Sequence, residues 1–93
     1  MLPLRGDALV DAVKLAFGRV LRRARKRAGL SQEDLGLESG VARNFISLIE
    51  LGRNQPALET LFRLSDALDT LPSRLLAEVE AELRHVRRSR RRV

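Results

Sequence analysis

The sequence predicts an all-α protein of five helices, and three observations support this fold class. Only three prolines and six glycines interrupt the 93 residues, so the segments between them are long enough for helices. No segment shows the alternation of polar and apolar residues, with β-branched enrichment, that marks a half-buried strand. Apolar residues instead recur at helical spacing. At this length the chain is expected to form one small core.

The first helix is expected to begin at Asp7 and to end before Gly29, a residue type that often terminates helices. Arg25 borders its apolar face, where a charge requires a partner. The apolar stripe consists of Val10, Val13, Phe17, Val20, Leu21, Ala24 and Ala28. The opposite side carries Arg19, Arg22, Arg23 and Lys26.

Capping and turn residues place the other four helices. Ser31 is expected to cap the second helix, with acidic residues in its first turn, and Gly40 to end it. The third helix is expected at residues 42–51 and the fourth at residues 57–68. Pro72 opens the fifth, whose apolar stripe consists of Leu75, Leu76, Val79, Leu83 and Val86. Residues 87–93 have nothing to bury and are expected to be disordered.

The composition argues against an enzyme. The chain has no cysteine, and His85 is its only histidine. Disulfides, thiolate nucleophiles and cysteine-based zinc sites are therefore excluded. A catalytic serine–histidine pair could draw on only one histidine. We expect no metal, no cofactor and no small-molecule ligand. Without a long apolar run or a signal peptide, the sequence indicates a soluble cytoplasmic protein that does not enter a membrane.

The net charge of +6 suggests a polyanionic partner. Two runs, at residues 19–27 and 84–92, hold most of the basic residues, whereas residues 59–82 are mainly acidic. Such segregation favours phosphate contacts at the basic faces. The alternative for the first helix is that most of its arginines are ordinary solvated charges.

The most informative spacing lies in residues 32–51. Two short helices joined by a tight turn need a small residue where they cross, and Gly36 supplies it. The turn needs a residue that tolerates positive φ, and Gly40 supplies that. The shared core needs apolar residues, and these are Leu35, Val41, Ile46 and Ile49. The combination predicts a helix-turn-helix.

A family-level pattern extends this motif over roughly residues 17–76. It consists of Gly29-Leu30-Ser31-Gln32-Glu33-Asp34-Leu35, Gly40-Val41, Ile46-Ser47, Ile49-Glu50, Gly52-Arg53, Pro56 and Thr60-Leu61. This pattern resembles the XRE, or phage-repressor and Cro-like, helix-turn-helix family. The resemblance implies a five-helix lambda-repressor-like DNA-binding domain. Around it lie an N-terminal extension at 1–16, an extended C-terminal helix at 77–86 and the basic tail at 87–93.

The resemblance also implies residue roles. The helix at 42–51 would lie in the major groove of double-stranded DNA, with the preceding helix across the backbone. Arginine can pair with guanine and asparagine with adenine. The expected base-reading residues are Arg43, Asn44, Ser47 and Leu48. The alternatives are that Arg43 or Asn44 contacts phosphate alone and that Leu48, which could touch a thymine methyl group, is merely exposed.

Phosphate contacts are expected from the start of the second helix and from the third helix with its following loop. The candidates are Gln32, Phe45, Arg53, Asn54 and Gln55. Gln32 could instead be a simple first-turn polar residue, and core packing is the favoured alternative for Phe45. Members of the family often pair an arginine of the first helix with a glutamate that ends the recognition helix. Arg25 and Glu50 occupy those positions, and their ion pair is expected to fix the tilt of this helix.

A homodimer is expected, because two half-sites are then read together. The stripe of the fifth helix and the N-terminal extension are alternative interfaces, and the stripe could instead pack on its own domain. The tail either reaches DNA or is a solvated end. Its candidate non-specific contacts are Arg87, Arg88, Arg90, Arg91 and Arg92.

The function that the sequence favours is a sequence-specific DNA-binding transcription regulator, in the form of a homodimeric repressor of a palindromic operator. The alternative is an antitoxin that binds a toxin-like protein partner and also represses its own promoter. An RNA or single-strand binder is disfavoured, because three phenylalanines provide no aromatic platform for stacked bases.

Overall fold

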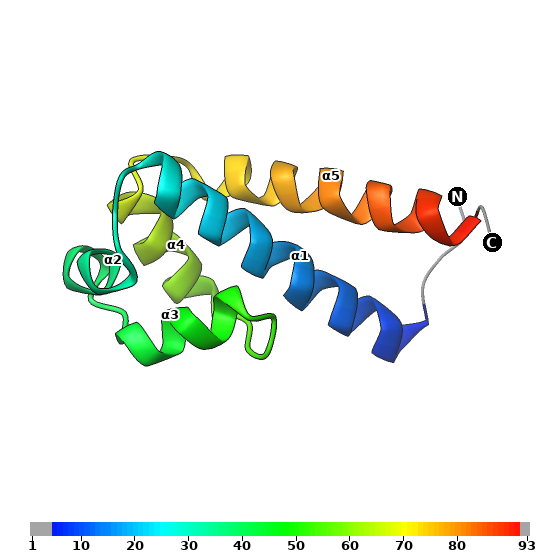
Figure 1. Ribbon diagram of the computed structural model, residues 1–93, viewed down its shortest axis with the longest axis horizontal. Helices are drawn as coiled ribbons and strands as arrows, with labels where there is room; N and C mark the ends of the chain where they lie inside the picture. The colour runs from blue at the N-terminus through cyan, green and yellow to red at the C-terminus, as the bar shows by residue number, and fades with distance from the viewer. Residues whose placement is uncertain (1–4, 92–93) are drawn as a thin grey trace.

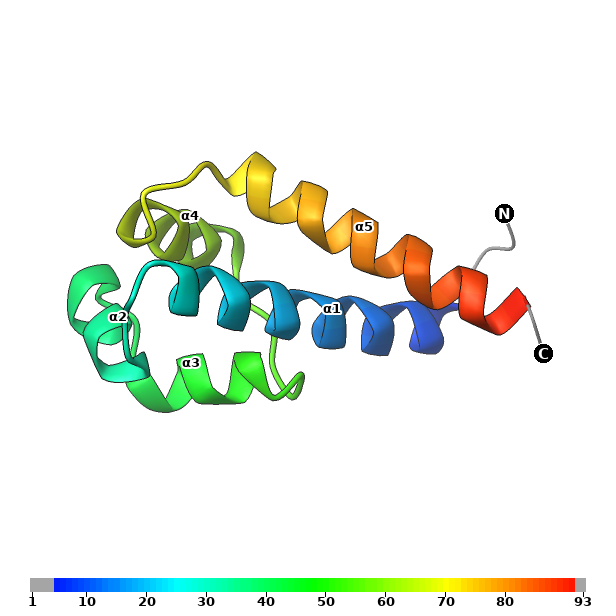
Figure 2. The same ribbon diagram turned by 45° about the horizontal axis from the view of Figure 1, so that its top comes forward.

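The computed structural model describes residues 5–91, with side chains through residue 85. Its five helices are α1 (Gly6–Arg27), α2 (Gln32–Ser39), α3 (Arg43–Glu50), α4 (Leu58–Ala67) and α5 (Pro72–Arg91). Helices α2, α3 and α4 gather at one end of the molecule, and α1 and α5 run along its length (Figures 1 and 2). The described residues contain no strand, so the all-α prediction is confirmed. None of the described helices is long and apolar enough to cross a membrane.

The core forms where α1 meets α3 and α5, and α2 packs on α3 and α4. Helix α1 contributes Ala16, Phe17, Val20, Leu21 and Ala24, all buried. Val10 is 44% exposed, and Ala28 is also exposed, although both were expected in the buried stripe. In Figure 1 the first turns of α1 extend past α3, so α3 does not cover this end of the helix.

Helix α5 packs its apolar stripe against its own chain. Leu75 and Val79 are buried, and Leu83 packs against the core. Leu76 remains 44% exposed. This packing within the chain was the alternative to a dimer interface on this stripe.

The backbone of α5 continues to Arg91, so residues 87–91, which the sequence suggested to be disordered, are helical. Extending an existing helix fixes one residue for each hydrogen bond gained, and arginine has a high helix propensity. The lack of apolar residues therefore does not end this helix.

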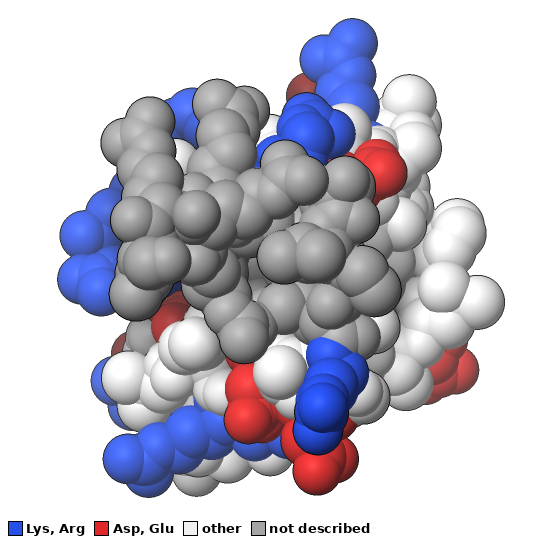
Figure 3. Space-filling view, turned by 90° about the vertical axis from the view of Figure 1, so that its right-hand side faces the viewer, with Lys and Arg blue, Asp and Glu red and all other residues white. Residues whose placement is uncertain are grey.

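Ion pairs join the basic side of α1 to the acidic side of α5. Arg23 Nη1 lies 2.6 Å from Glu82 Oε1, and Arg27 Nη2 lies 3.1 Å from Glu78 Oε2. Arg19 lies 3.9 Å from Glu82. The acidic segment thus neutralises part of the first basic run, which was expected to face phosphate. Figure 3, which looks onto the end that carries the C-terminus of α5, shows basic and acidic side chains interspersed.

The helix caps agree with the sequence in most places. Ser31 Oγ accepts a hydrogen bond from the Asp34 amide, and the Asp34 carboxylate accepts one from the Ser31 amide. These bonds, chiefly the one from the Ser31 backbone, lower the pKa of Asp34. Ala42 and Ala57, which precede α3 and α4, make no side-chain cap bond. Asp69 adopts a φ of 53°, the left-handed geometry that follows a helix end.

Candidate nucleic-acid interface

The turn between α2 and α3 is as tight as the spacing predicted. A Cβ on Gly36 would lie 3.0 Å from the carbonyl oxygen of Val41, so the turn passes close to α2 at this point. Gly40 has a φ of 74°, in the left-handed region. Leu35, Val41 and Ile46 are buried in the core. The helix-turn-helix is therefore present where residues 32–51 predicted it.

Helix α3 has one buried face and one open face. Ile46 and Ile49 are completely buried. Successive residues of a helix turn by about 100°, so the four expected base-reading residues fall within an arc of about 140° on the other side. Arg43 and Asn44 are exposed, and Ser47 and Leu48 are half-buried. The structure thus brings all four together on the open face.

Phe45 does not belong to this face. It is partly buried and packs against the core. Its amide donates to the carbonyl oxygen of Ala42 at 3.0 Å, and its ring carries no hydrogen-bond donor for a phosphate. We therefore replace the phosphate contact expected for Phe45 with the core-packing alternative.

Arg25 and Glu50 form a bidentate ion pair between α1 and the end of α3. Arg25 Nε and Nη2 donate to the two carboxylate oxygens of Glu50, at 2.7 Å and 2.9 Å. Arg25 Nη1 also donates to the carbonyl oxygen of Leu30 at 3.0 Å. The Glu50 side chain is 5% exposed and the Arg25 side chain 11%. The hydrogen bonds to Glu50 raise the pKa of Arg25, so the guanidinium stays charged.

The ion pair also offsets an unfavourable position of Glu50. The C-terminus of a helix carries partial negative charge, which repels a carboxylate. Helix α3 has no basic residue in its last turn to compensate. Arg25 supplies the missing positive charge from α1 and holds the end of α3 in place.

Gln32 also donates a hydrogen bond to the Glu50 carboxylate, a contact that the sequence did not predict. Its Nε2 donates to Glu50 Oε1 at 3.1 Å, so Glu50 connects α1, α2 and α3. A glutamine amide has two N–H groups, and one of them is used here. The expected phosphate contact needs only the other.

The loop after α3 closes the end of the helix with its backbone. Gly52 has a φ of 76°, and the amides of Arg53 and Asn54 donate to the carbonyl oxygen of Leu48 at 3.0 Å and 3.3 Å. The side chains of Arg53 and Gln55 are exposed, and that of Asn54 is half-buried. The phosphate contacts expected of Arg53 and Asn54 therefore rest on their side chains, because their amides already donate to Leu48.

Gly18 positions α3 and was missed by the sequence reading. A Cβ on this residue would lie 2.5 Å from the Ile49 carbonyl oxygen and 2.8 Å from that of Glu50. Only glycine lets the backbones of α1 and α3 approach this closely. A glycine inside a helix costs about 1 kcal/mol relative to alanine. A glycine in the middle of the predicted first helix was therefore the sequence feature that could have indicated this close contact.

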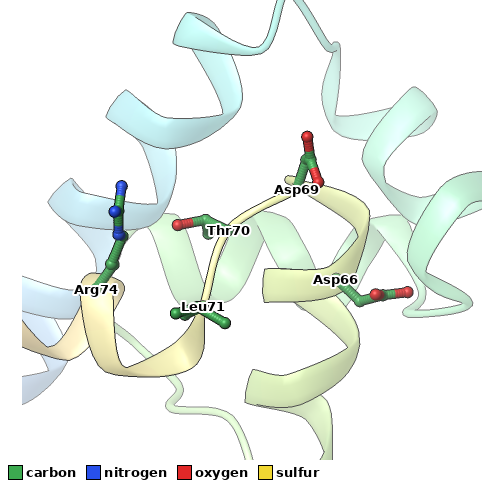
Figure 4. Close-up of a pocket in the computed structure, with 5 residues that line it drawn as sticks. All are labelled: Asp66, Asp69, Thr70, Leu71 and Arg74. Carbon is green, nitrogen blue, oxygen red and sulfur yellow. The ribbon is translucent and has the colours of Figure 1, made fainter.

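The other surface features of the described residues do not combine into a catalytic or metal-binding site. An open pocket of about 340 Å³ lies where α4 turns into α5, lined by Asp66, Asp69, Thr70, Leu71 and Arg74. Figure 4 shows that Asp66 and Asp69 point in different directions, so they form no shared carboxylate pair. Among the described residues, no group of three or more metal-binding side chains could hold an ion. The five arginine side chains expected as tail contacts lie outside the described side chains.

Comparisons with known proteins agree with the geometry. The helix-turn-helix family model matches residues 21–75, more than half of the chain. The control protein C.MunI from a Mycoplasma species is 32% identical over 74 residues, which cover 78% of this chain and 100% of that protein.

Two solved structures have the same fold. The restriction-modification controller protein C.AhdI from Aeromonas hydrophila matches with a TM-score of 0.65 at 37% identity, over 67% of this chain and 94% of that one. The clp gene regulator ClgR from Corynebacterium glutamicum matches with a TM-score of 0.76 at 26% identity, over 86% and 87% of the two chains. The chain therefore belongs to the XRE-like helix-turn-helix family of DNA-binding transcription regulators.

Proposed function

We propose that this protein binds a palindromic operator as a homodimer and represses transcription there, with α3 in the major groove. The observation that carries the proposal is the open face of α3. It presents Arg43, Asn44, Ser47 and Leu48 over a buried face, and the Arg25–Glu50 ion pair holds its end. A helix of this kind enters the major groove with its N-terminal residues toward the base edges.

Phosphate contacts would come from the two sides of α3. Gln32 begins α2, where the amides of the first turn and the positive end of the helix dipole favour an anion. Arg53 and Gln55 extend from the loop at the other end, with Asn54 between them. Contacts of this kind fix the register of the protein on DNA, whereas contacts to bases determine which DNA sequence the protein prefers.

The relatives suggest the kind of gene control. C.MunI is named a control protein, and C.AhdI is described as a restriction-modification controller. We propose that this chain is a regulator of the same type. These relatives favour transcription control over the antitoxin alternative.

Selection of bound sequences from a pool of random duplexes tests the proposal. We expect two inverted half-sites whose centres lie about one helical turn, or roughly 34 Å, apart. Each half-site should contain positions that strongly prefer one base, because a good bidentate pair discriminates by about 1–3 kcal/mol. Binding that is salt-dependent but indifferent to sequence would contradict the proposal.

A further inference from the structure

The side of α5 that faces away from α1 carries a row of arginines. Leu75 and Val79 of α5 are buried in the core, and Glu78 and Glu82 pair with arginines of α1. Successive residues of a helix turn by about 100°, so these contacts define the side of α5 that meets α1. The backbone of α5 is helical through Arg91. Its register places four arginines within an arc of about 100° on the opposite side, which we call the arginine row: Arg84, Arg87, Arg88 and Arg91.

The described part of this side is open to solvent. Ala77, Glu80 and Arg84 share it, and all three are exposed. By the same register, Ser89 and Arg90 belong to the α1 side of the helix and lie outside the row. The row therefore occupies one face of α5, and not every arginine near the end of the helix belongs to it.

The arginine row and the open face of α3 lie on opposite sides of the protein. Helix α1 packs on both α3 and α5 and lies between them (Figures 1 and 2). Ile46 and Ile49 turn the buried face of α3 toward the core, so its open face is directed away from α1. A straight duplex that is held by α3 therefore does not meet the arginine row of the same chain. The row is left for a second ligand.

The chemistry of the row fits the phosphate backbone of a duplex. Arginine binds phosphate through two parallel hydrogen bonds. The row extends over about 10 Å of helix, and one strand of duplex DNA carries a phosphate about every 3.4 Å along its axis. Helix α5 contains no phenylalanine, tyrosine or tryptophan on which the bases of a single strand could stack. A helix that binds a membrane surface needs a free apolar side, whereas that of α5 is buried against the core.

We propose that the arginine row binds the phosphate backbone of a second DNA duplex, so that the protein holds two duplex segments together. The chain belongs to a family of DNA-binding regulators, so duplex DNA is the polyanion that surrounds it when it is bound. The inference rests on the proposed function in one respect, because α3 must hold the first duplex. Contacts to phosphate carry no sequence information, so the second duplex is bound regardless of its sequence.

The first experiment measures whether the full chain bridges two duplexes. The protein is bound to an immobilised duplex that carries its selected half-sites, and a free fluorescent duplex of unrelated sequence is added at several salt concentrations. We expect the free duplex to be recruited, with an affinity that falls with salt at a log–log slope of about −0.9 for each phosphate contacted. A wild-type chain that binds the immobilised duplex and recruits no free duplex would overturn the proposal.

Two variants of identical composition separate the row from the total charge. Arg88→Ser combined with Ser89→Arg moves one arginine from the row to the α1 side of the helix. Arg90→Ser combined with Ser89→Arg moves one arginine between two positions outside the row. The first variant should weaken recruitment of the free duplex and reduce the salt slope by about 1, whereas the second should leave both unchanged. Equal recruitment by the two variants would refute the row.

A second pair of variants uses side chains that the structure describes. Arg84→Gln removes a member of the row, and Arg74→Gln removes an exposed arginine of the first turn of the same helix. Glutamine and arginine have similar helix propensities, so α5 should persist in both, which circular dichroism checks. Only Arg84→Gln should reduce the salt slope of recruitment, again by about 1. Recruitment that is as strong with Arg84→Gln as with Arg74→Gln would contradict the proposal.

Competition identifies the ligand of the row and separates this inference from the function on which it depends. Excess unlabelled duplex should release the fluorescent duplex, and a single-stranded oligonucleotide or vesicles of anionic lipid at equal charge should release less. More effective release by either competitor would overturn the assignment to duplex DNA. If Arg84→Gln weakens binding to the immobilised duplex and leaves recruitment unchanged, the row contacts the operator and the proposal is wrong. Failure of the wild-type chain to select any sequence would instead overturn the proposed function.

Discussion

One carboxylate, that of Glu50, determines how the proposed reading helix is held. It accepts hydrogen bonds from Arg25 on α1 and from Gln32 on α2. Its side chain is only 5% exposed, so water cannot replace these partners. Removing one member of a buried ion pair leaves the other charged and desolvated.

Glu50→Ala should therefore lower the free energy of unfolding by about 3–5 kcal/mol, measured by urea denaturation. Glu78→Ala is the control, because its pairs with Arg23 and Arg27 are exposed, and exposed pairs contribute about 1 kcal/mol or less. Where the Glu50 variant remains folded, its DNA sequence preference should persist. An unchanged urea midpoint for Glu50→Ala would show that the pair does not hold α3.

At the scale of the helices, the contact between α1 and α3 depends on Gly18. The hypothetical Cβ meets two backbone carbonyl oxygens, and backbone cannot move aside as a flexible side chain can. The end of α3 that lies here is the end that Glu50 holds. The spacing of α1 and α3 and the tilt of α3 are therefore coupled.

Gly18→Ala should destabilise the fold by about 1–3 kcal/mol, the usual cost of overpacking a core, although alanine is the better helix former. Gly6→Ala is the matched control, since a Cβ on Gly6 has no atom within 4 Å. Chemical denaturation of both variants measures the difference. Equal stability of Gly18→Ala and the wild type would mean that α3 moves away from α1 at no cost.

The sequence predicted the elements well because local signals define them. Ser31, Gly40 and Pro72 mark helix ends through their own backbone chemistry, and Gly36 with Gly40 located the turn. Contacts between distant segments were harder to predict. The Gln32–Glu50 hydrogen bond and the close approach at Gly18 depend on how helices cross, which periodicity does not report. The Arg25–Glu50 pair was expected only because family resemblance supplied the partner.

For the whole molecule, the net charge gave the right class of partner but not the reading surface. Folding places acidic residues of α5 against arginines of α1, as in the Arg23–Glu82 pair. Much of the first basic run is thus balanced within the protein. The proposed reading surface is set by the open face of α3, on which Arg43 is the single charged residue.

The central claim is that this face reads bases, and the most direct test repeats the duplex selection with Arg43→Ala. The account predicts that preference disappears at one position in each half-site while the other positions and the spacing persist, because one base contact is removed. Arg22→Ala removes the same charge from α1, so it should weaken affinity, if at all, equally for all sequences. An Arg43→Ala variant that selects the same half-sites as the wild type would contradict the account.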